Sequence, residues 1–215
     1  MTLSIVARDP ITGALGVATA TAGPSVGALV VHGAAGVGAI ATQAMTNPLY
    51  GIHGIGYLRS GFSAAQTLER LLGEDDDSER RQVMIVDVNG QIAHWSGRLC
   101  GTYAGCLVTS ECVVGGNLLL NDHTLTAMLD HYHQSQNESF DDRLFAALEA
   151  GAGAGGDRRG IKSAALKIWL DREYASVDTR VDWSETPLDA LKEVIRQQRS
   201  RSYADFFAKL PQGIP

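Results

Sequence analysis

Apolar and polar residues alternate along much of the chain, which is the pattern of half-buried β-strands. The alternation begins at the first residues, MTLSIVAR, where Leu3, Ile5 and Ala7 share one face. An Asn89-Gly90 pair between two alternating runs is typical of a β-hairpin. The pattern predicts strands at about residues 2–8, 14–21, 27–32, 36–43, 82–88, 91–96, 102–109, 111–116, 162–170 and 177–181.

Helical patterns separate these strands into groups. Ser63 and Gln66 have the spacing of a capping box, and leucines follow at the positions of an apolar helix stripe. Ser139 is expected to cap another helix, with Asp142 in its first turn. Helices are predicted at about residues 50–59, 63–72, 121–133, 139–150 and 185–199.

The order of these elements predicts the fold class. Antiparallel strand pairs that alternate with helix pairs are typical of an α+β fold, with two antiparallel sheets face to face and helices outside. We therefore expect a four-layer αββα sandwich. It should span residues 1–182, and residues 183–215 should form a C-terminal helix and tail that pack on the same domain or form an oligomer interface.

Composition narrows the class of protein. The chain has 215 residues, of which 45% are hydrophobic and 20% charged, so it can bury the core of one large domain. A net charge of −6 without a basic stripe argues against nucleic-acid binding. The sequence has no apolar run of membrane-spanning length and no signal-peptide pattern, which predicts no membrane contact and a cytoplasmic location.

Metal binding is not expected. Cys100, Cys106 and Cys112 are spaced more widely than the ligand pairs of zinc sites, so we interpret them as structural core residues. The acidic run at residues 74–77 lacks the glycine and ligand spacing of a calcium loop and is interpreted as a solvated loop.

Thr2 is the first candidate for chemistry. Removal of the initiator methionine before this small residue would leave a threonine hydroxyl and a free α-amine in one residue. The amine can take the hydroxyl proton while the oxygen attacks a carbonyl carbon. An α-amine has an ordinary pKa of about 7.7–8.0, which suits a general base near neutral pH. The alternative is that threonine is a common second residue and belongs to an ordinary first strand.

Topology and the N-terminus together favour Thr2 as a nucleophile. The αββα sandwich is the fold of the N-terminal nucleophile (Ntn) hydrolases, in which the nucleophile is the first residue of a strand. Ser4 is the next candidate, although it has no α-amine of its own. Cleavage at Gly101-Thr102 would expose a different threonine, but we reject it because the encoded N-terminus already supplies one. No cofactor is expected, because nucleophile, base and oxyanion donors would all be protein groups.

Several polar residues could complete such a site. Gln43 and Asn47 flank the end of the predicted fourth strand, where either could supply an amide to the site or cap a turn. Asn117 follows Gly115 and Gly116, so backbone N–H groups there could approach an oxyanion, or the glycines could form a β-bulge.

A glycine-rich segment that carries Asp157, Arg158 and Arg159 precedes the ninth predicted strand. One of these arginines could hold a substrate carboxylate through two parallel hydrogen bonds, and Asp157 could orient the base. A structural ion pair or a solvated loop is the alternative.

The stretches SIVARDPITGALGVA, GVGAIATQAMTNPLYG and AGGDRRGIKSAAL resemble the bacterial family described as domain of unknown function 1028, which is assigned to the Ntn-hydrolase-like superfamily. The similarity covers about residues 1–182. It implies the Ntn fold, Thr2 as nucleophile and amide hydrolysis, but no particular substrate. Residues 21–25 depart from the bulkier aromatic pattern expected there, which implies a different substrate if they line the pocket. Ser163 resembles, in position only, a serine near the nucleophile of proteasome-type proteins.

These observations predict an Ntn-type amidohydrolase that cleaves a small, carboxylate-bearing amide. The alternative is a catalytically inactive ligand-binding or scaffold protein with the same fold. A homo-oligomer is also expected from an apolar stripe on the last helix, unless that stripe packs on its own domain. The stripe consists of Leu188, Leu191, Val194 and Ile195.

Overall fold

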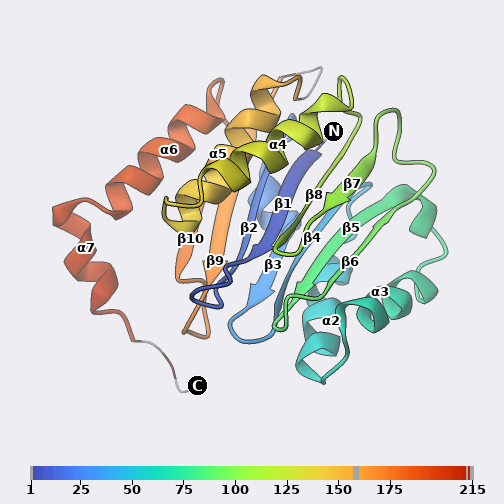
Figure 1. Cartoon of the computed structure of the whole chain (residues 1–215), viewed down its shortest axis with the longest axis horizontal. Coiled ribbons are helices and arrows are strands. Elements are labelled where there is room, and N and C mark those ends of the chain that lie inside the picture. Colours follow the sequence, from blue (N-terminus) through green and yellow to red (C-terminus); the bar gives the residue numbers. More distant parts are fainter. Residues whose placement is uncertain (1, 157–159, 212, 214–215) are drawn as a thin grey trace.

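Two antiparallel sheets form the centre of the computed structural model, which describes residues 2–156, 160–211 and 213 (Figure 1). In order across the larger sheet, the six strands are β10 (Val177–Val181), β9 (Ser163–Trp169), β2 (Leu15–Thr21), β1 (Thr2–Arg8), β8 (Cys112–Asn117) and β7 (Gly105–Val108). The smaller sheet has the order β3 (Val31–Ala34), β4 (Gly38–Ala44), β5 (Arg81–Asp87) and β6 (Ile92–Ser96). The N-terminal strand β1 therefore lies in the middle of the larger sheet.

Two helices cover one face of the six-stranded sheet. These are α4 (His123–Gln134) and α5 (Phe140–Gly153), which lie across β1, β2 and β8 in Figure 1. Leu3 and Ile5 of β1 are fully buried in the same core cluster as Leu148 of α5. The alternation at the start of the chain thus directs its strictly apolar face toward these helices.

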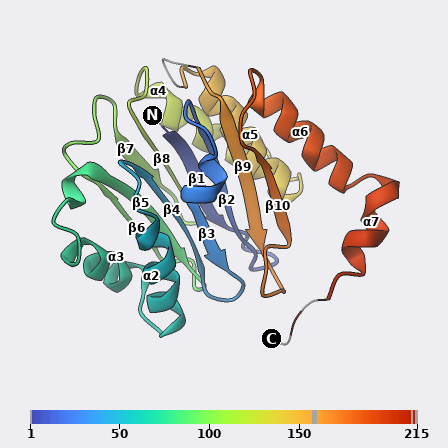
Figure 2. The same ribbon diagram turned by 180° about the vertical axis from the view of Figure 1, so that it is seen from behind.

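Two other helices pack on the four-stranded sheet. α2 (Pro48–Arg59) and α3 (Ala64–Gly73) bury Leu58 and Leu71 against Ile40 of β4 and its neighbours. Figure 2 shows these helices beside β3 to β6, with α4 and α5 on the far side of the molecule. Each sheet therefore has one face covered by helices.

The remaining faces of the two sheets meet each other. Val6 and Val17 from the larger sheet share a buried cluster with Ala41, Met84 and Val86 from the smaller sheet. Side chains on a strand alternate between its two faces. Every second residue of β1 therefore faces the smaller sheet, and this face includes the first position of the strand.

Most elements agree with the sequence pattern. β10 begins and ends as predicted, and Ser63 and Gln66 form the predicted capping box at the start of α3. Ser139 takes the predicted N-cap position of α5, but its hydroxyl bonds to the carboxylates of Asp141 and Asp142 and makes no bond to the helix backbone.

The predicted strand at residues 27–32 is wrong. This segment begins as a short helix, α1 (Val26–Leu29), and the strand β3 starts only after it. A Cβ atom on Gly27 would lie 2.5 Å from the Cβ atom of Ala165 on β9. The glycine therefore lets α1 pack directly on the larger sheet, a contact between distant residues that local sequence does not reveal.

The C-terminal helices differ in part from the prediction. In α6 (Pro187–Gln198), Leu191 and Ile195 are buried against the strands β9 and β10. The stripe that suggested an oligomer interface is thus largely covered by its own domain, and the homo-oligomer stays a prediction. A further helix, α7 (Arg201–Ala208), occupies the expected short tail and lies beyond α6 in Figure 2. In the described part of the chain, no helix has both the length and the apolar character that a membrane crossing requires.

Candidate active site

Thr2 occupies the first position of β1 and heads a row of polar residues across four strands. The register places Thr2 opposite Thr21 on β2 and opposite Asn117 on β8, and it places Thr21 opposite Ser163 on β9. Directly paired residues of antiparallel strands project to the same face. Because Val6 of β1 belongs to the core between the sheets, this row also faces the smaller sheet. The fold thus places two predicted site residues in the same row as Thr2: Asn117 is its direct strand partner, and Ser163 lies one strand further away.

The described surroundings of Thr2 are polar but neutral. Thr2 is only 7% exposed, and its Oγ1 donates to Oγ1 of Thr21 over 3.1 Å. Its backbone carbonyl lies 3.5 Å from Nε2 of Gln43. These contacts fix the position of Thr2 without supplying a charged base. The α-amine of Thr2 itself would be the base if Met1 were removed.

Buried amides connect the two sheets beside Thr2. Gln43 on β4 lies opposite Gln82 on β5 in the smaller sheet. Gln82 Oε1 accepts from Nε2 of Gln43 over 2.8 Å and from Nδ2 of Asn117 over 3.0 Å. Gln82 Nε2 donates to the carbonyl oxygen of Gly116 over 2.9 Å. All three side chains are buried, so these bonds hold the amides of Gln43, Gln82 and Asn117 in one arrangement.

Ser4 takes part in the same contacts between the sheets. Its Oγ lies 2.6 Å from Oε1 of Gln43 and 2.7 Å from Oγ1 of Thr19, and the residue is fully buried. A hydroxyl enclosed in this way is out of reach of a substrate. The structure therefore disfavours Ser4 as an alternative to Thr2 as nucleophile.

Ser163 belongs to the row, but its hydroxyl is hydrogen-bonded to backbone groups. Its Oγ donates to the carbonyl oxygen of Gly23 over 2.6 Å and accepts from the N–H of Val26 over 3.2 Å. Ser163 thus fixes the segment between β2 and α1 near the end of the row. Its role in substrate binding stays a prediction.

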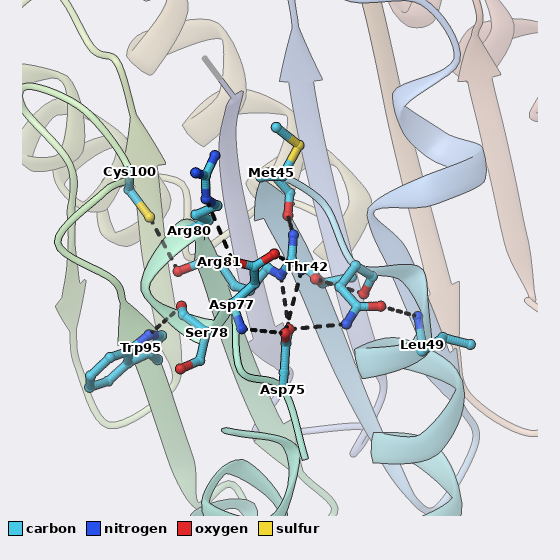
Figure 3. Close-up of polar contacts among 11 residues, drawn as sticks. Thr42, Met45, Leu49, Asp75, Asp77, Ser78, Arg80, Arg81, Trp95 and Cys100 are labelled. Atoms are coloured by element: carbon cyan, nitrogen blue, oxygen red, sulfur yellow. Dashed lines mark hydrogen bonds and ion pairs between the residues drawn. The ribbon is translucent and has the colours of Figure 1, made fainter. Parts of the chain in front are cut away.

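Asn47 is a helix cap. Its Oδ1 accepts from the N–H of Leu49 in the first turn of α2, and its Nδ2 donates to Asp75 over 3.2 Å. Asp75 also accepts from Nε of Arg81 over 2.9 Å (Figure 3). The Arg81 guanidinium holds the pKa of the Asp75 carboxyl well below its usual range. Of the two roles open to Asn47, the structure favours the turn cap, and Gln43 is the amide that reaches Thr2.

A cavity of about 250 Å³ opens beside Asn117. Its wall includes Ala44 and Met45 at the end of β4, Leu118 after β8, and Arg80 before β5. Ala44 has a φ of 70° and Leu118 a φ of 51°, in the left-handed region that residues with a side chain rarely adopt. Such strain costs on the order of 1–3 kcal/mol per residue and gathers at functional sites. The cavity is therefore a candidate ligand site next to the strand partner of Thr2.

The cysteines do not compete with Thr2 as nucleophiles. Burial raises the pKa of Cys106 and of Cys112 to about 11, so both thiols stay protonated near neutral pH. Burial also raises the pKa of Cys100. Among the residues that the structure describes, no group of three or more His, Cys, Asp and Glu side chains is arranged to hold a metal ion.

Asp157, Arg158 and Arg159 lie outside the described residues. The chain that follows them is held against β2, because the N–H of Lys162 donates to the carbonyl oxygen of Thr21 over 2.8 Å. Lys162 therefore lies at the end of β2 that carries the polar row. The roles of Asp157, Arg158 and Arg159 in the site stay predictions.

Two residues of this region were not predicted from the sequence. Gln82 had a usable signal, because it alternates with Met84 and Val86 and so shares their face between the sheets. Arg80 had no such signal, since its place on the cavity wall depends on how the short 3-10 helix Ser78–Arg80 lies relative to the end of β8.

Comparison with known proteins identifies the family to which the chain is similar. The family of unknown function DUF1028 matches residues 2–191. A crystal structure of a DUF1028 protein from Silicibacter pomeroyi has a TM-score of 0.92 and 30% sequence identity, and the match covers 98% of this chain and 95% of that chain. Anbu, the ancestral beta-subunit from Yersinia bercovieri, has a TM-score of 0.45 and 11% identity over 99% of both chains. No curated protein matches the chain. The resemblance noted in the sequence is thus confirmed, and the chain belongs to the family of unknown function DUF1028.

Proposed function

We propose that this protein is an N-terminal nucleophile amidohydrolase, in which Thr2 is the nucleophile and its α-amine, freed by removal of Met1, is the base. One observation carries the proposal: Thr2 stands at the first position of a central strand, on the face between the sheets, and is paired with Asn117 beside a cavity. We also assign the fold as a four-layer αββα sandwich. The helix pairs that pack on each sheet support this assignment.

The reaction follows from these groups. The α-amine takes the proton from Thr2 Oγ1, and the oxygen attacks the carbonyl carbon of the amide to give a tetrahedral intermediate. When the intermediate collapses, the C–N bond breaks and the ammonium group returns the proton to the leaving amine. A water molecule then attacks the ester on Thr2, with the α-amine again as base, and releases the acid.

Asn117 is our candidate for the oxyanion donor. A side-chain amide nitrogen carries two N–H donors, and the bond to Gln82 uses one of those on Asn117. The second can bond to the substrate oxygen as it becomes negative. Gln82 and Gln43 hold this amide in place, and donors fixed in advance stabilise a developing charge most effectively. Gln43 would act by positioning Thr2 and the network rather than by reacting.

The substrate we propose is a small amide that bears a carboxylate. In this proposal Asp157 orients the α-amine, and Arg158 or Arg159 approaches the carboxylate. Their support is the sequence position of the segment, which leads into Ser163 at the end of the row that contains Thr2.

Turnover by the chain that begins at Thr2 tests the proposal, with a panel of acylated amino acids, carbamoyl compounds and dipeptides. Thr2→Ala should fold like the parent and show no turnover. Thr2→Ser should keep part of the activity, because the hydroxyl and the α-amine both remain. Thr102→Ala is the matched control, since it removes an exposed threonine hydroxyl and the alternative terminus after Gly101. A parent inactive on the whole panel, or an active Thr2→Ala variant, would contradict the proposal.

A further inference from the structure

We propose that the cavity beside Asn117 is the acid-binding part of the substrate site, and that Arg80 binds there the carboxylate of a small N-acylated amino acid. This inference rests on the proposed function, which it deepens by giving the carboxylate a described partner, Arg80, in addition to Arg158 or Arg159. The cavity is lined by Asn117 and Arg80, and Asn117 is the cross-strand partner of Thr2. A molecule held by Arg80 would therefore lie against the proposed oxyanion donor.

Arg80 gives the cavity its charge. Among the described residues that line it, the other side chains are uncharged. The apolar part of the wall comes from Met45, Leu99 and Leu118. A mainly apolar pocket with a few polar groups at fixed positions is the usual form of a small-molecule site. The composition of the wall thus favours a ligand with one anionic group and a short apolar portion.

Arg80 and its neighbour Arg81 differ in what their guanidinium groups contact. Arg81 is 13% exposed, and it donates to Asp75 over 2.9 Å and to the carbonyl oxygen of Met45 over 2.8 Å. Arg80 has an ion pair of 3.7 Å with Asp77, and the two side chains are 52% and 66% exposed. An exposed ion pair of this kind contributes little. Figure 3 shows Arg81 directed toward Asp75 and the guanidinium of Arg80 directed away from it.

The backbone that carries Arg80 is well anchored. Its N–H donates to the carbonyl oxygen of Asp77, and its carbonyl oxygen accepts from the N–H of Met45. The side chain can therefore exchange Asp77 for a ligand without a change in the 3-10 helix Ser78–Arg80 that carries it. A guanidinium group presents parallel N–H donors that match a carboxylate, which gives geometric selectivity as well as charge.

The cavity volume limits the size of the ligand. About 250 Å³ corresponds to roughly eight water molecules at about 30 Å³ each. This space suits a small acylated amino acid and excludes a longer peptide from the cavity itself. The strained backbone of Ala44 and Leu118 on its wall is consistent with a shape maintained for a ligand.

Binding to the Thr2→Ala chain tests the inference without turnover. The probes are N-acetyl-L-alanine, its uncharged amide and inorganic phosphate, followed by N-acetyl derivatives of other small amino acids, with Kd measured by calorimetry. Arg80→Gln should raise the Kd of the acids by roughly tenfold to a hundredfold and leave that of the uncharged amide unchanged. Arg80→Lys should give an intermediate Kd, because lysine keeps the charge but loses the planar contact.

The matched control is Arg196→Gln, which removes an exposed arginine from α6 on the other side of the larger sheet and should change no Kd. Equal acid binding by the Arg80→Gln variant and its parent would overturn the inference. So would a parent that binds none of the acids, or that binds phosphate more tightly than all of them. Since Thr2→Ala cannot turn over, binding reports on the acid site alone. Arg80-dependent binding with an inactive Thr2 chain would uphold the acid site and refute the proposed function.

Discussion

Gln82→Met should strongly destabilise the protein. The glutamine is fully buried between the sheets, and methionine replaces it with an apolar side chain of similar length. The substitution removes the acceptor for the Gln43 and Asn117 amides and the donor to the carbonyl oxygens of Gly116 and Gly105 and to the hydroxyl of Ser96. The partners on Gln43, Asn117 and Gly116 stay buried, because they belong to strands of both sheets. The variant therefore creates unsatisfied polar groups rather than new solvent contacts.

The magnitude follows from the number of orphaned groups. A buried donor or acceptor left without its partner costs about 1–3 kcal/mol. The groups on Gln43, Asn117 and Gly116 are the buried ones among those that lose a partner. With these three groups, and some recovery from the apolar side chain, we expect a loss of about 3–6 kcal/mol. A domain of this kind has a total stability of about 5–15 kcal/mol, so the variant should be close to unfolding.

Urea denaturation measures this loss through the free energy of unfolding. Gln91→Met is the matched control, because Gln91 is exposed and the change should stay within about 0.5 kcal/mol. A Gln82→Met variant that loses less than about 1 kcal/mol with an unchanged m value would refute the claim that this network joins the sheets.

Three further predictions concern acid stability and the proposed site. Arg81 lowers the pKa of Asp75, so the pair should stabilise the fold above the ordinary value of 3.8 and progressively less below it. Asp75→Asn should consequently cost the most stability at neutral pH and somewhat less near pH 3, because the Asp75 carboxyl of the folded chain is still ionised there, as urea titrations at about these two pH values would show. Asn117→Ala should lower kcat by about a hundredfold to a thousandfold through loss of the oxyanion donor, and steady-state kinetics that show an unchanged kcat would remove this role. Arg158→Lys or Arg159→Lys should chiefly raise KM, because a carboxylate contact is made in ground and transition states alike, and an unchanged KM in both variants would assign these arginines to structure.

The strands of both sheets could be predicted well because alternation and turn residues are local features of the sequence. Alternation identified the strands, and the Asn89-Gly90 pair identified the hairpin between β5 and β6. The sequence-based prediction was wrong at residues 27–32, where the contact of Gly27 with Ala165 favours a helix over the strand that the local residues indicate. It also missed α7, whose aromatic residues Tyr203 and Phe206 are more than half exposed and so form no buried stripe.

The candidate site was predictable only in part. Thr2, Gln43 and Asn117 come together because strand register aligns them, and each stands at a recognisable place at the start or end of a strand. The choice between Gln43 and Asn47 could not be made from sequence, since it depends on which amide lies between the sheets and which caps a helix. Arg80 could not be found either, because the cavity it lines is formed where the ends of β4, β8 and the 3-10 helix Ser78–Arg80 meet.

The central claim is that Thr2 acts with its own α-amine. The most direct measurement compares the hydrolysis rate of the chain that begins at Thr2, verified by intact mass, with that of the same chain carrying an uncleaved extension before Thr2. We predict turnover for the first and none for the second, because an amide nitrogen cannot serve as the base. Equal turnover by the extended chain would contradict the claim.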